Sequence, residues 1–251
     1  MKAFIFAAGL GTRLKPLTDT MPKALVPIGG VPMLKILLNK LISNGYDDIV
    51  INVHHFAEQI ENYIFENNSF SVKITFSDER DLLRDTGGGI KHAKTLLLEG
   101  NGEPILVHNV DILSNLDLNW FRSIFLSSRA EANNPLIATI LVSERDTSRY
   151  FLFDDSNRLV GWTNIATGEV KSPYPDLDVA KCRKLAFAGV HTISPEIFPL
   201  MDSFPETFSI VDFYLSICDK YSIVGVLQDG LEIHDIGKLS DLYKFNTFAQ
   251  I

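Results

Sequence analysis

Apolar residues follow two different spacings along the first half of the chain. Short, fully apolar runs are typical of buried strands, and apolar residues three and four positions apart predict helices that lie on a sheet. The predicted strands are 2–8, 48–53, 72–76 and 104–107, and the predicted helices are 32–44, 56–65 and 88–98. This alternation predicts an α/β fold with a mostly parallel mixed sheet that helices flank on both faces.

The pattern changes near residue 136, where predicted strands follow one another and are joined by turns. These strands are 137–142, 150–153, 158–163, 186–193, 223–227 and 232–234, and two helices are predicted over 208–219 and 239–248. Residues 165–181 have no clear period and contain two prolines, which predicts a long, mobile excursion. Because we find no repeat and no linker, we expect one domain over residues 1–251, with a second half (136–251) richer in strands than the first (1–135).

Residues with candidate chemistry follow three of the predicted strands. They are the loop that begins at Gly9, residues 85–89 and residues 108–111. Ligands of open α/β sheets bind at the carboxyl ends of the strands. We therefore expect the functional site at this edge of the sheet.

The composition is that of an acidic globular protein. The formal net charge is −8, with 46% hydrophobic and 22% charged residues. This acidic balance argues against a nucleic-acid partner, because a phosphate backbone attracts clustered cations. The longest apolar runs are too short to span a bilayer, so we expect no membrane association. We expect a monomer or a small homo-oligomer.

The cysteines and the start of the chain favour a cytoplasmic location. Cys182 and Cys218 form neither a metal-binding spacing nor a disulfide framework. Gly9 and Gly11 interrupt the apolar stretch at the start of the chain, which is unlike a secretory signal. We therefore expect the reducing environment of the cytoplasm.

Glycines and cations gather in the loop after the first predicted strand, which contains Gly9, Gly11, Arg13 and Lys23. A lone Gly-x-Gly is also compatible with a tight turn at the strand exit. However, backbone N–H groups freed by glycine, beside a guanidinium and an ammonium, suit a triphosphate. Leu14 takes the position of the third glycine of a dinucleotide fingerprint, which argues against a dehydrogenase, and the G-x-x-x-x-G-K-[ST] phosphate loop is absent.

The same loop resembles a family signature. Residues 7–14 read AAGLGTRL, residues 16–18 read PLT and residues 22–23 read PK. This sequence is similar to the signature of sugar-1-phosphate nucleotidyltransferases, AAGxGTRLxPLT followed by PK. Further segments follow in the family's order, namely TGGG at 86–89, Asn109-x-Asp111, FAG at 187–189 and DIG at 235–237. The resemblance implies a Rossmann-like nucleotidyltransferase fold in which the first half binds the nucleotide and the second half binds the sugar.

The resemblance also implies a site, residue by residue. Arg13 would hold the β- and γ-phosphates, and Lys23 would bridge the α-phosphate and the sugar phosphate. With Asp111 they would carry the catalysis, by neutralising charge that builds up in the transition state. The residues implied for nucleotide binding are Ala8, Gly9, Gly11, Thr12, Arg13, Lys23, Gly87 and Gly88; those for sugar binding are Asn109 and Gly189; and those for a Mg²⁺ ion are Asp111 and Asp235.

The two aspartates also have simpler explanations. Asp111 could cap a helix that begins near Asp117, and Asp235 could be a turn residue. Two histidines, His108 and His234, lie near these aspartates in the sequence. We expect them to lie behind the ligands and not to bind the ion, because Mg²⁺ prefers oxygen.

Two glycines and two departures from the family pattern bear on the substrate pocket. Gly189 could mark a β-bulge inside its strand, and Gly89 could be a flexible helix entry. Val110 stands where the family usually has glycine, so its side chain must point away from the sugar phosphate or narrow the site. Ser77 stands where many relatives have glutamine for base recognition, which leaves uracil and guanine open.

The resemblance implies transfer of a nucleotidyl group from an NTP to a sugar 1-phosphate, which gives an NDP-sugar and pyrophosphate. Asp85 and the glycines after it resemble the short uridylyltransferases that act on N-acetylmuramate α-1-phosphate, so UTP with that sugar phosphate is the expected pair. The alternative is a guanylyltransferase for mannose or heptose 1-phosphate. An alternative of another class is a non-catalytic nucleotide-sugar sensor, but regulatory relatives typically lose one of Arg13, Lys23, Asp111 and Asp235, and all four are present.

Overall fold

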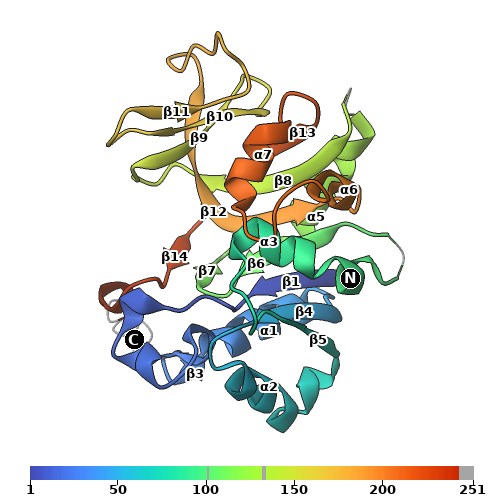
Figure 1. Cartoon of the computed structure of the whole chain (residues 1–251), viewed down its shortest axis with the longest axis vertical. Coiled ribbons are helices and arrows are strands. Elements are labelled where there is room, and N and C mark those ends of the chain that lie inside the picture. Colours follow the sequence, from blue (N-terminus) through green and yellow to red (C-terminus); the bar gives the residue numbers. More distant parts are fainter. Residues whose placement is uncertain (101, 132–133, 243–251) are drawn as a thin grey trace.

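A computed structural model describes residues 1–100, 102–131 and 134–242, and ten strands of these residues form one sheet (Figure 1). Four of them, β1 (Lys2–Phe6), β4 (Asp48–Val53), β5 (Lys73–Asp78) and β6 (Ile105–Asn109), come from the first half of the chain. The other six are β8 (Leu136–Ser143), β9 (Arg149–Phe153), β10 (Leu159–Asn164), β11 (Glu169–Lys171), β12 (Arg183–Ile193) and β13 (Ser222–Val226).

The strand order is β11-β10-β9-β12-β6-β1-β4-β5, and β8 with its neighbour β13 branches from β12. The prediction of a mixed, mostly parallel central sheet is confirmed, because β6, β1, β4 and β5 run parallel to one another. The long strand β12 runs antiparallel to β6 and so joins the strands of the second half to the central strands. Two small antiparallel sheets complete the fold: the hairpin of β2 (Pro27–Ile28) with β3 (Val31–Pro32), and the pair of β7 (Ile112–Ser114) with β14 (Ile233–Asp235), which are far apart in the sequence.

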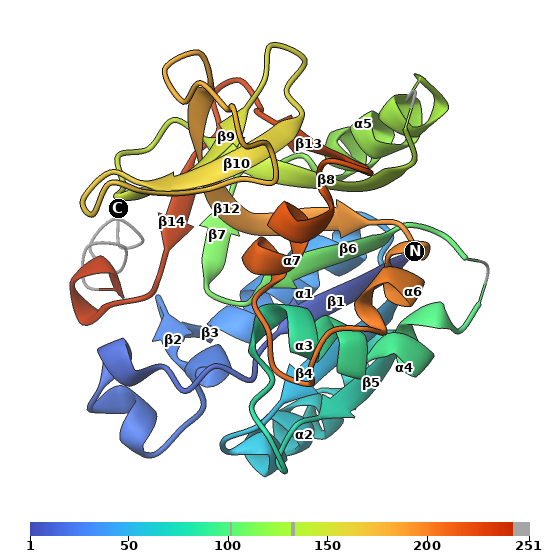
Figure 2. The same ribbon diagram turned by 45° about the horizontal axis from the view of Figure 1, so that its top comes forward.

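Helices cover both faces of the sheet, and the apolar residues of the strands explain why. Along β1, Phe4 packs into one apolar cluster, whereas Ala3 and Ile5 pack into another on the opposite face. A strand buried on both faces reads as a continuous apolar run. The Phe4 face is covered by α3 (Asp85–His92), α4 (Lys94–Leu98), α6 (Ile197–Met201) and α7 (Ile210–Ile217), seen in front of the sheet in Figure 2. The Ala3 face is covered by α1 (Met33–Ser43), α2 (Ala57–Glu66) and α5 (Leu118–Glu131).

Some predicted elements differ from those of the structure. The helix predicted over 88–98 is divided at Ala93 into α3 and α4. The excursion over 165–181 contains the short strand β11, which pairs with β10. Most of the helix predicted over 239–248 lies beyond Leu242 and thus outside the described residues. No helix in the described part of the chain is long and apolar enough to cross a membrane.

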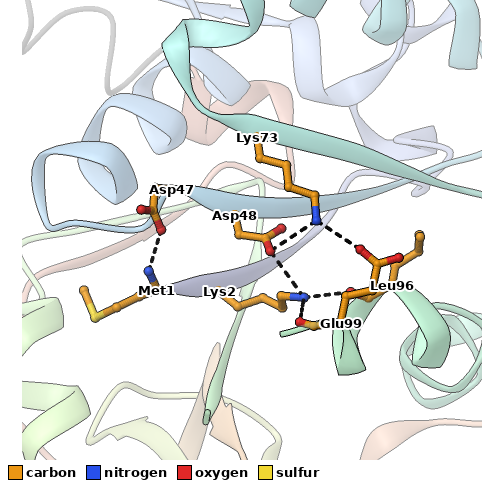
Figure 3. A network of polar contacts seen from close by, with 7 residues as sticks. All are labelled: Met1, Lys2, Asp47, Asp48, Lys73, Leu96 and Glu99. Atoms are coloured by element: carbon orange, nitrogen blue, oxygen red, sulfur yellow. Dashed lines mark hydrogen bonds and ion pairs between the residues drawn. The ribbon is translucent and has the colours of Figure 1, made fainter. Parts of the chain in front are cut away.

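A network of ion pairs holds the edge of the sheet where the parallel strands begin (Figure 3). Lys2 Nζ donates to the backbone oxygens of Leu96 at 2.8 Å and Glu99 at 2.6 Å, and lies 3.4 Å from a carboxylate oxygen of Asp48. Lys73 links the side chains of Asp48 and Glu99. Because helix C-termini leave carbonyl groups without helical partners, Lys2 stabilises the end of α4. These cations serve the fold and lie away from the carboxyl ends of the strands.

The core also contains a neutral histidine. His191 in β12 is buried, and its Nδ1 lies 2.6 Å from the Tyr214 hydroxyl in a hydrogen bond. Burial, with a smaller effect of His108, lowers the pKa of His191 to about 3. In the unfolded chain the pKa of a histidine is about 6.5. Below that pH the unfolded chain binds a proton that the folded chain does not.

We therefore predict that acidification destabilises the protein through His191. The loss begins as the pH falls through about 6.5 and reaches about 2 kcal/mol of unfolding free energy at pH 5. Denaturant melts of the unmodified chain and of His191→Gln between pH 7 and 5 should diverge, with the shallower pH dependence in the variant. Parallel curves for the two proteins would contradict the assignment of a neutral histidine.

Candidate active site

A cavity of about 350 Å³ opens at the carboxyl ends of the central parallel strands. Its wall is built from residues 7–9 after β1, Asn52 in β4, Glu79 after β5, and residues 109–111 at the end of β6, and Lys23 also lines it. This volume is in the range of small-molecule sites. The cavity therefore lies where the sequence predicts the ligand-binding edge.

The structure brings the two predicted metal aspartates together. Asp111 follows β6, and Asp235 ends β14, where it pairs with Ile112 of the antiparallel strand β7. The amide of Ile236 also donates to the backbone oxygen of Asp111 at 2.9 Å. The alternative that Asp111 caps α5 is wrong, because the side chain of Asp117 accepts that hydrogen bond, from the Trp120 amide.

The environment of Asp235 suits a bound cation. Its Oδ1 is buried without a hydrogen-bond partner among the described residues. Burial raises the pKa of Asp235, and the charge of Asp111 raises it further. A partly buried carboxylate with an unsatisfied oxygen, beside a second carboxylate, is stabilised in its ionised form by positive charge nearby. No group of three or more His, Cys, Asp and Glu side chains that could hold a metal ion occurs among the described residues, and the binding of Mg²⁺ by these two aspartates stays a prediction.

Three cations surround the aspartate pair. Lys23 Nζ forms an ion pair with Asp111 Oδ2, and both side chains are largely buried. Arg145, after β8, donates from Nη2 to the Phe187 oxygen at 3.2 Å, and its Nη1 lies 3.9 Å from Asp235 Oδ2. Arg13 also lies near Asp235, where its positive charge opposes the rise in the pKa of that carboxyl. Arg145 was not predicted, because no motif distinguishes it from the other exposed arginines of the chain.

The glycine loop is held against the C-terminal part of the site by apolar packing. Leu14 and Ile28 pack with Leu113 in β7 and with Ile236, which directly follows Asp235. Leu14, which takes the place of a third glycine, is fully buried there. Among the residues predicted to bind the nucleotide, Ala8, Gly9 and Lys23 line the cavity, and Gly11, Thr12 and Arg13 lie next to them in the same loop. This packing accounts for how one loop reaches both aspartates.

Gly87 and Gly88 have a structural role that the sequence did not reveal. Both amides donate to the backbone oxygen of Phe208, at 2.9 and 3.1 Å. A Cβ atom on Gly87 would lie 2.3 Å from the Phe208 ring, and one on Gly88 would lie 2.1 Å from the Glu206 oxygen. The N–H groups of these glycines are therefore already occupied by residues that precede α7. Their predicted contact with the nucleotide stays a prediction, whereas Asp85 and Thr86 at the start of α3 do line the cavity.

Asn109 and Gly189, predicted for the sugar, lie side by side. Gly189 has a φ of +74°, and a Cβ atom there would lie 2.8 Å from Asn109 Nδ2. The pairing of β12 with β8 shifts register between Phe187 and His191, which fits the β-bulge alternative, and the contact of Gly189 with the sugar stays a prediction. The bulge at Gly189 brings the backbone of β12 close to the end of β6.

Val110 and His108 both face the interior. Val110 is 3% exposed and packs in the apolar cluster of α1 and α2, so its side chain adds little to the cavity. His108 Nδ1 donates to the Asn109 oxygen at 2.8 Å. Burial lowers the pKa of His108 to about 4, so its ring is neutral at pH 7. Neither residue adds charge to the site.

Comparisons with known proteins found a matching family model, similar sequences and similar structures. A family model described as nucleotidyl transferase matches residues 2–160. The chain is 31% identical to N-acetylmuramate alpha-1-phosphate uridylyltransferase of Caulobacter vibrioides, over 92% of this chain and 90% of that protein. It is 32% identical to mannose-1-phosphate guanylyltransferase 1 of Arabidopsis thaliana, over 67% of this chain and 48% of that protein. The crystal structure of HddC from Yersinia pseudotuberculosis complexed with GMP-PN matches with a TM-score of 0.73 and 23% identity over 98% of both chains, which bears on the fold alone.

Substitutions at Gly9 and Gly11 should distinguish a glycine that leaves room for a ligand from a glycine that the fold requires. A Cβ atom on Gly9 would meet no protein atom within 4 Å, because Gly9 lines the cavity. Gly11 has a φ of +63°, and its Cβ atom would lie 2.8 Å from Thr18. Gly9→Ala should therefore keep the melting temperature and weaken binding of an NTP, whereas Gly11→Ala should lower the unfolding free energy by about 1–3 kcal/mol.

Thermal melts with and without UTP or GTP in Mg²⁺ would check both variants. The interpretation of Gly9 as ligand space fails if Gly9→Ala responds to the nucleotides as the unmodified chain does.

Proposed function

Since the chain belongs to the nucleotidyl transferase family, we propose that it transfers a uridylyl group from UTP to N-acetylmuramate α-1-phosphate. The products are the UDP-sugar and pyrophosphate. The observation that carries this proposal is the aspartate pair beside the cavity, in which Asp111 forms an ion pair with Lys23 and Asp235 feels the positive charge of Arg13. An anionic substrate with several phosphates and a shared divalent ion would satisfy both sets of charges.

In this proposal the chemistry needs no general base. A sugar phosphate is already an anion near neutral pH, so its oxygen can attack the α-phosphate of the NTP directly. The protein then contributes orientation and charge neutralisation. Lys23 would leave its ion pair with Asp111 for the α-phosphate, and Arg13 would hold the phosphates that leave as pyrophosphate. These roles explain why both cations lie in the loop that begins at the cavity wall.

Asp111 and Asp235 would hold a Mg²⁺ ion. The buried, unpartnered Oδ1 of Asp235 supports this assignment, as does the proximity of the two carboxylates. Mg²⁺ is usually bound by one or two carboxylates together with phosphate and water oxygens. Once bound, the ion would neutralise charge on the phosphates of the NTP.

Arg145 extends the proposed site toward the sugar. Its guanidinium lies between Asp235 and the Phe187 oxygen, two residues before Gly189. The Glu-Lys-Pro segment that often binds the sugar in this family is absent from residues 163–170. A cation from the strand-rich half at this position would face the phosphate of the sugar.

The choice of UTP with N-acetylmuramate 1-phosphate is supported by the Caulobacter relative, which aligns over most of both chains. Asp85, which lines the cavity with a φ of +59°, matches the acidic residue of that subgroup. A guanylyltransferase for mannose or heptose 1-phosphate is the second candidate; the Arabidopsis relative supports it, and the serine at position 77 leaves it open. The presence of Arg13, Lys23, Asp111 and Asp235 in one site favours either enzyme over a non-catalytic sensor.

The experiment is a matrix of NTPs and sugar 1-phosphates, assayed for pyrophosphate release. UTP, GTP, ATP, CTP and dTTP would each be combined with the 1-phosphates of N-acetylmuramate, mannose and glucose. We expect UTP with N-acetylmuramate 1-phosphate to exceed the other pairs in kcat/KM by about a hundredfold or more, because wrong partners leave buried polar groups unpaired. Turnover with GTP alone would contradict the uridylyl assignment. Absence of turnover with every pair would contradict the enzymatic proposal.

A further inference from the structure

Two buried polar side chains, Asn52 and Glu79, lie in the wall of the cavity beneath the start of the glycine loop. Asn52 is 2% exposed and belongs to β4, whereas Glu79 is fully buried and directly follows β5. Neither was predicted from the sequence to have a role in the site. Because a buried carboxylate is costly, its partners are informative.

Asn52 holds the chain where it leaves β1. Its Oδ1 accepts hydrogen bonds from the amides of Ala7 at 2.7 Å and Ala8 at 3.1 Å. β1 ends at Phe6, so these two amides lie just beyond the strand. The side chain of Asn52 supplies the acceptor that a buried amide requires. It therefore sets the direction in which the glycine loop begins.

Glu79 joins Asn52 to the segment before α3. Its Oε1 accepts from Asn52 Nδ2 at 2.8 Å, and its Oε2 accepts from the Arg84 amide at 3.2 Å. The amide of Glu79 donates to the Val53 oxygen at 2.8 Å, which holds it beside β4. The pair thus ties together the segments that follow β1 and β5 and the chain that enters α3.

The pair also explains the third glycine of α3. A Cβ atom on Gly89 would lie 2.9 Å from Glu79 Oε1 and 3.2 Å from Asn52 Nδ2. Glycine at this position leaves room for the hydrogen bond between the two side chains. Gly89 is therefore required by the pair, and a flexible helix entry is not needed to explain it.

We propose that Asn52 and Glu79 are a positioning pair that orients the Ala7–Ala8 turn for the triphosphate of the NTP. The orientation of the Asn52 amide is determined by its partners, because the oxygen must face two N–H donors and the nitrogen must face a carboxylate. Each hydrogen bond in the chain therefore has a defined donor and acceptor. The inference rests on the proposed NTP site, and concerns what shapes that site.

The defined polarity allows a test in which the shape and the net charge of the pair are kept. Asn52→Asp alone places two carboxylates face to face, and Glu79→Gln alone puts an amide where both neighbours are N–H donors. The double variant Asn52→Asp/Glu79→Gln reverses the donor between the side chains: the new aspartate still accepts from the loop amides, and the new glutamine donates to it while accepting from the Arg84 amide. The pair then carries one negative charge, as before.

The readout is the affinity for UTP and for GTP in Mg²⁺, measured by calorimetry, with KM for the sugar 1-phosphate in parallel. Each single variant should bind the preferred NTP about tenfold or more weakly, because a buried hydrogen bond is lost. The KM of the sugar 1-phosphate should change little. The double variant should recover to within about threefold of the unmodified chain, because the two substitutions are coupled.

Leu97→Ala, in α4, is the control for a loss of stability alone. It should lower the melting temperature by removing buried side-chain atoms, and leave NTP affinity unchanged. If Leu97→Ala weakens NTP binding as much as the single variants do, or if the single variants bind NTP normally, the positioning role is wrong. The positioning role is also wrong if the double variant loses as much NTP affinity as the two single variants combined.

This test is separable from the proposed function. A chain that prefers GTP contradicts only the uridylyl assignment, and the variants are then compared with GTP. A chain that binds neither nucleotide contradicts both proposals.

Discussion

The site depends on holding two like charges close together. Asp111 and Asp235 repel each other, and partial burial makes their ionised forms still less favourable, which is visible in the raised pKa of Asp235. The backbone offsets this repulsion, since β7 pairs with β14 and the Ile236 amide binds the Asp111 oxygen. Lys23 contributes the closest opposite charge. A site that concentrates charge in this way suits a substrate with many phosphates.

The fold makes this arrangement possible by bringing the ends of parallel strands to one edge. The residues after β1, β5 and β6 meet there, and β14 reaches the same edge from the C-terminal part of the chain. Apolar contacts of Leu14 with Ile236 fix the glycine loop against β14, while Asn52 and Glu79 fix its start from below. The loop is therefore held at both ends, and the cavity lies where it begins. The network around Lys2 stabilises the opposite edge and leaves this one available for ligands.

Much of this could be predicted from the sequence, for reasons that differ between the parts. Apolar runs predicted the central strands because both faces of the sheet are buried. The family signature over residues 7–23 pointed to the glycine loop with Lys23, and the segment Asn109-x-Asp111 pointed to Asp111. The roles of Asn52, Glu79 and Arg145 could not be predicted, because they arise from contacts between segments that are far apart in the sequence. Gly87 and Gly88 were predicted only for nucleotide binding, although the Phe208 ring, which lies far along the chain, already requires a glycine at position 87. A motif shows that a residue type is needed at a position, whereas only packing shows which neighbour needs it.

The central claim is that the two aspartates act together on one divalent ion. The most direct measurement is the affinity for Mn²⁺ in the presence of UTP, followed by electron paramagnetic resonance, for the unmodified chain and for Asp111→Asn, Asp235→Asn and the control Asp212→Asn on the exposed side of α7. Each site variant should bind Mn²⁺ about tenfold or more weakly, and the control should not change. Should both site variants keep the Mn²⁺ affinity of the unmodified chain while their melting temperatures stay the same, the shared ion site would be contradicted.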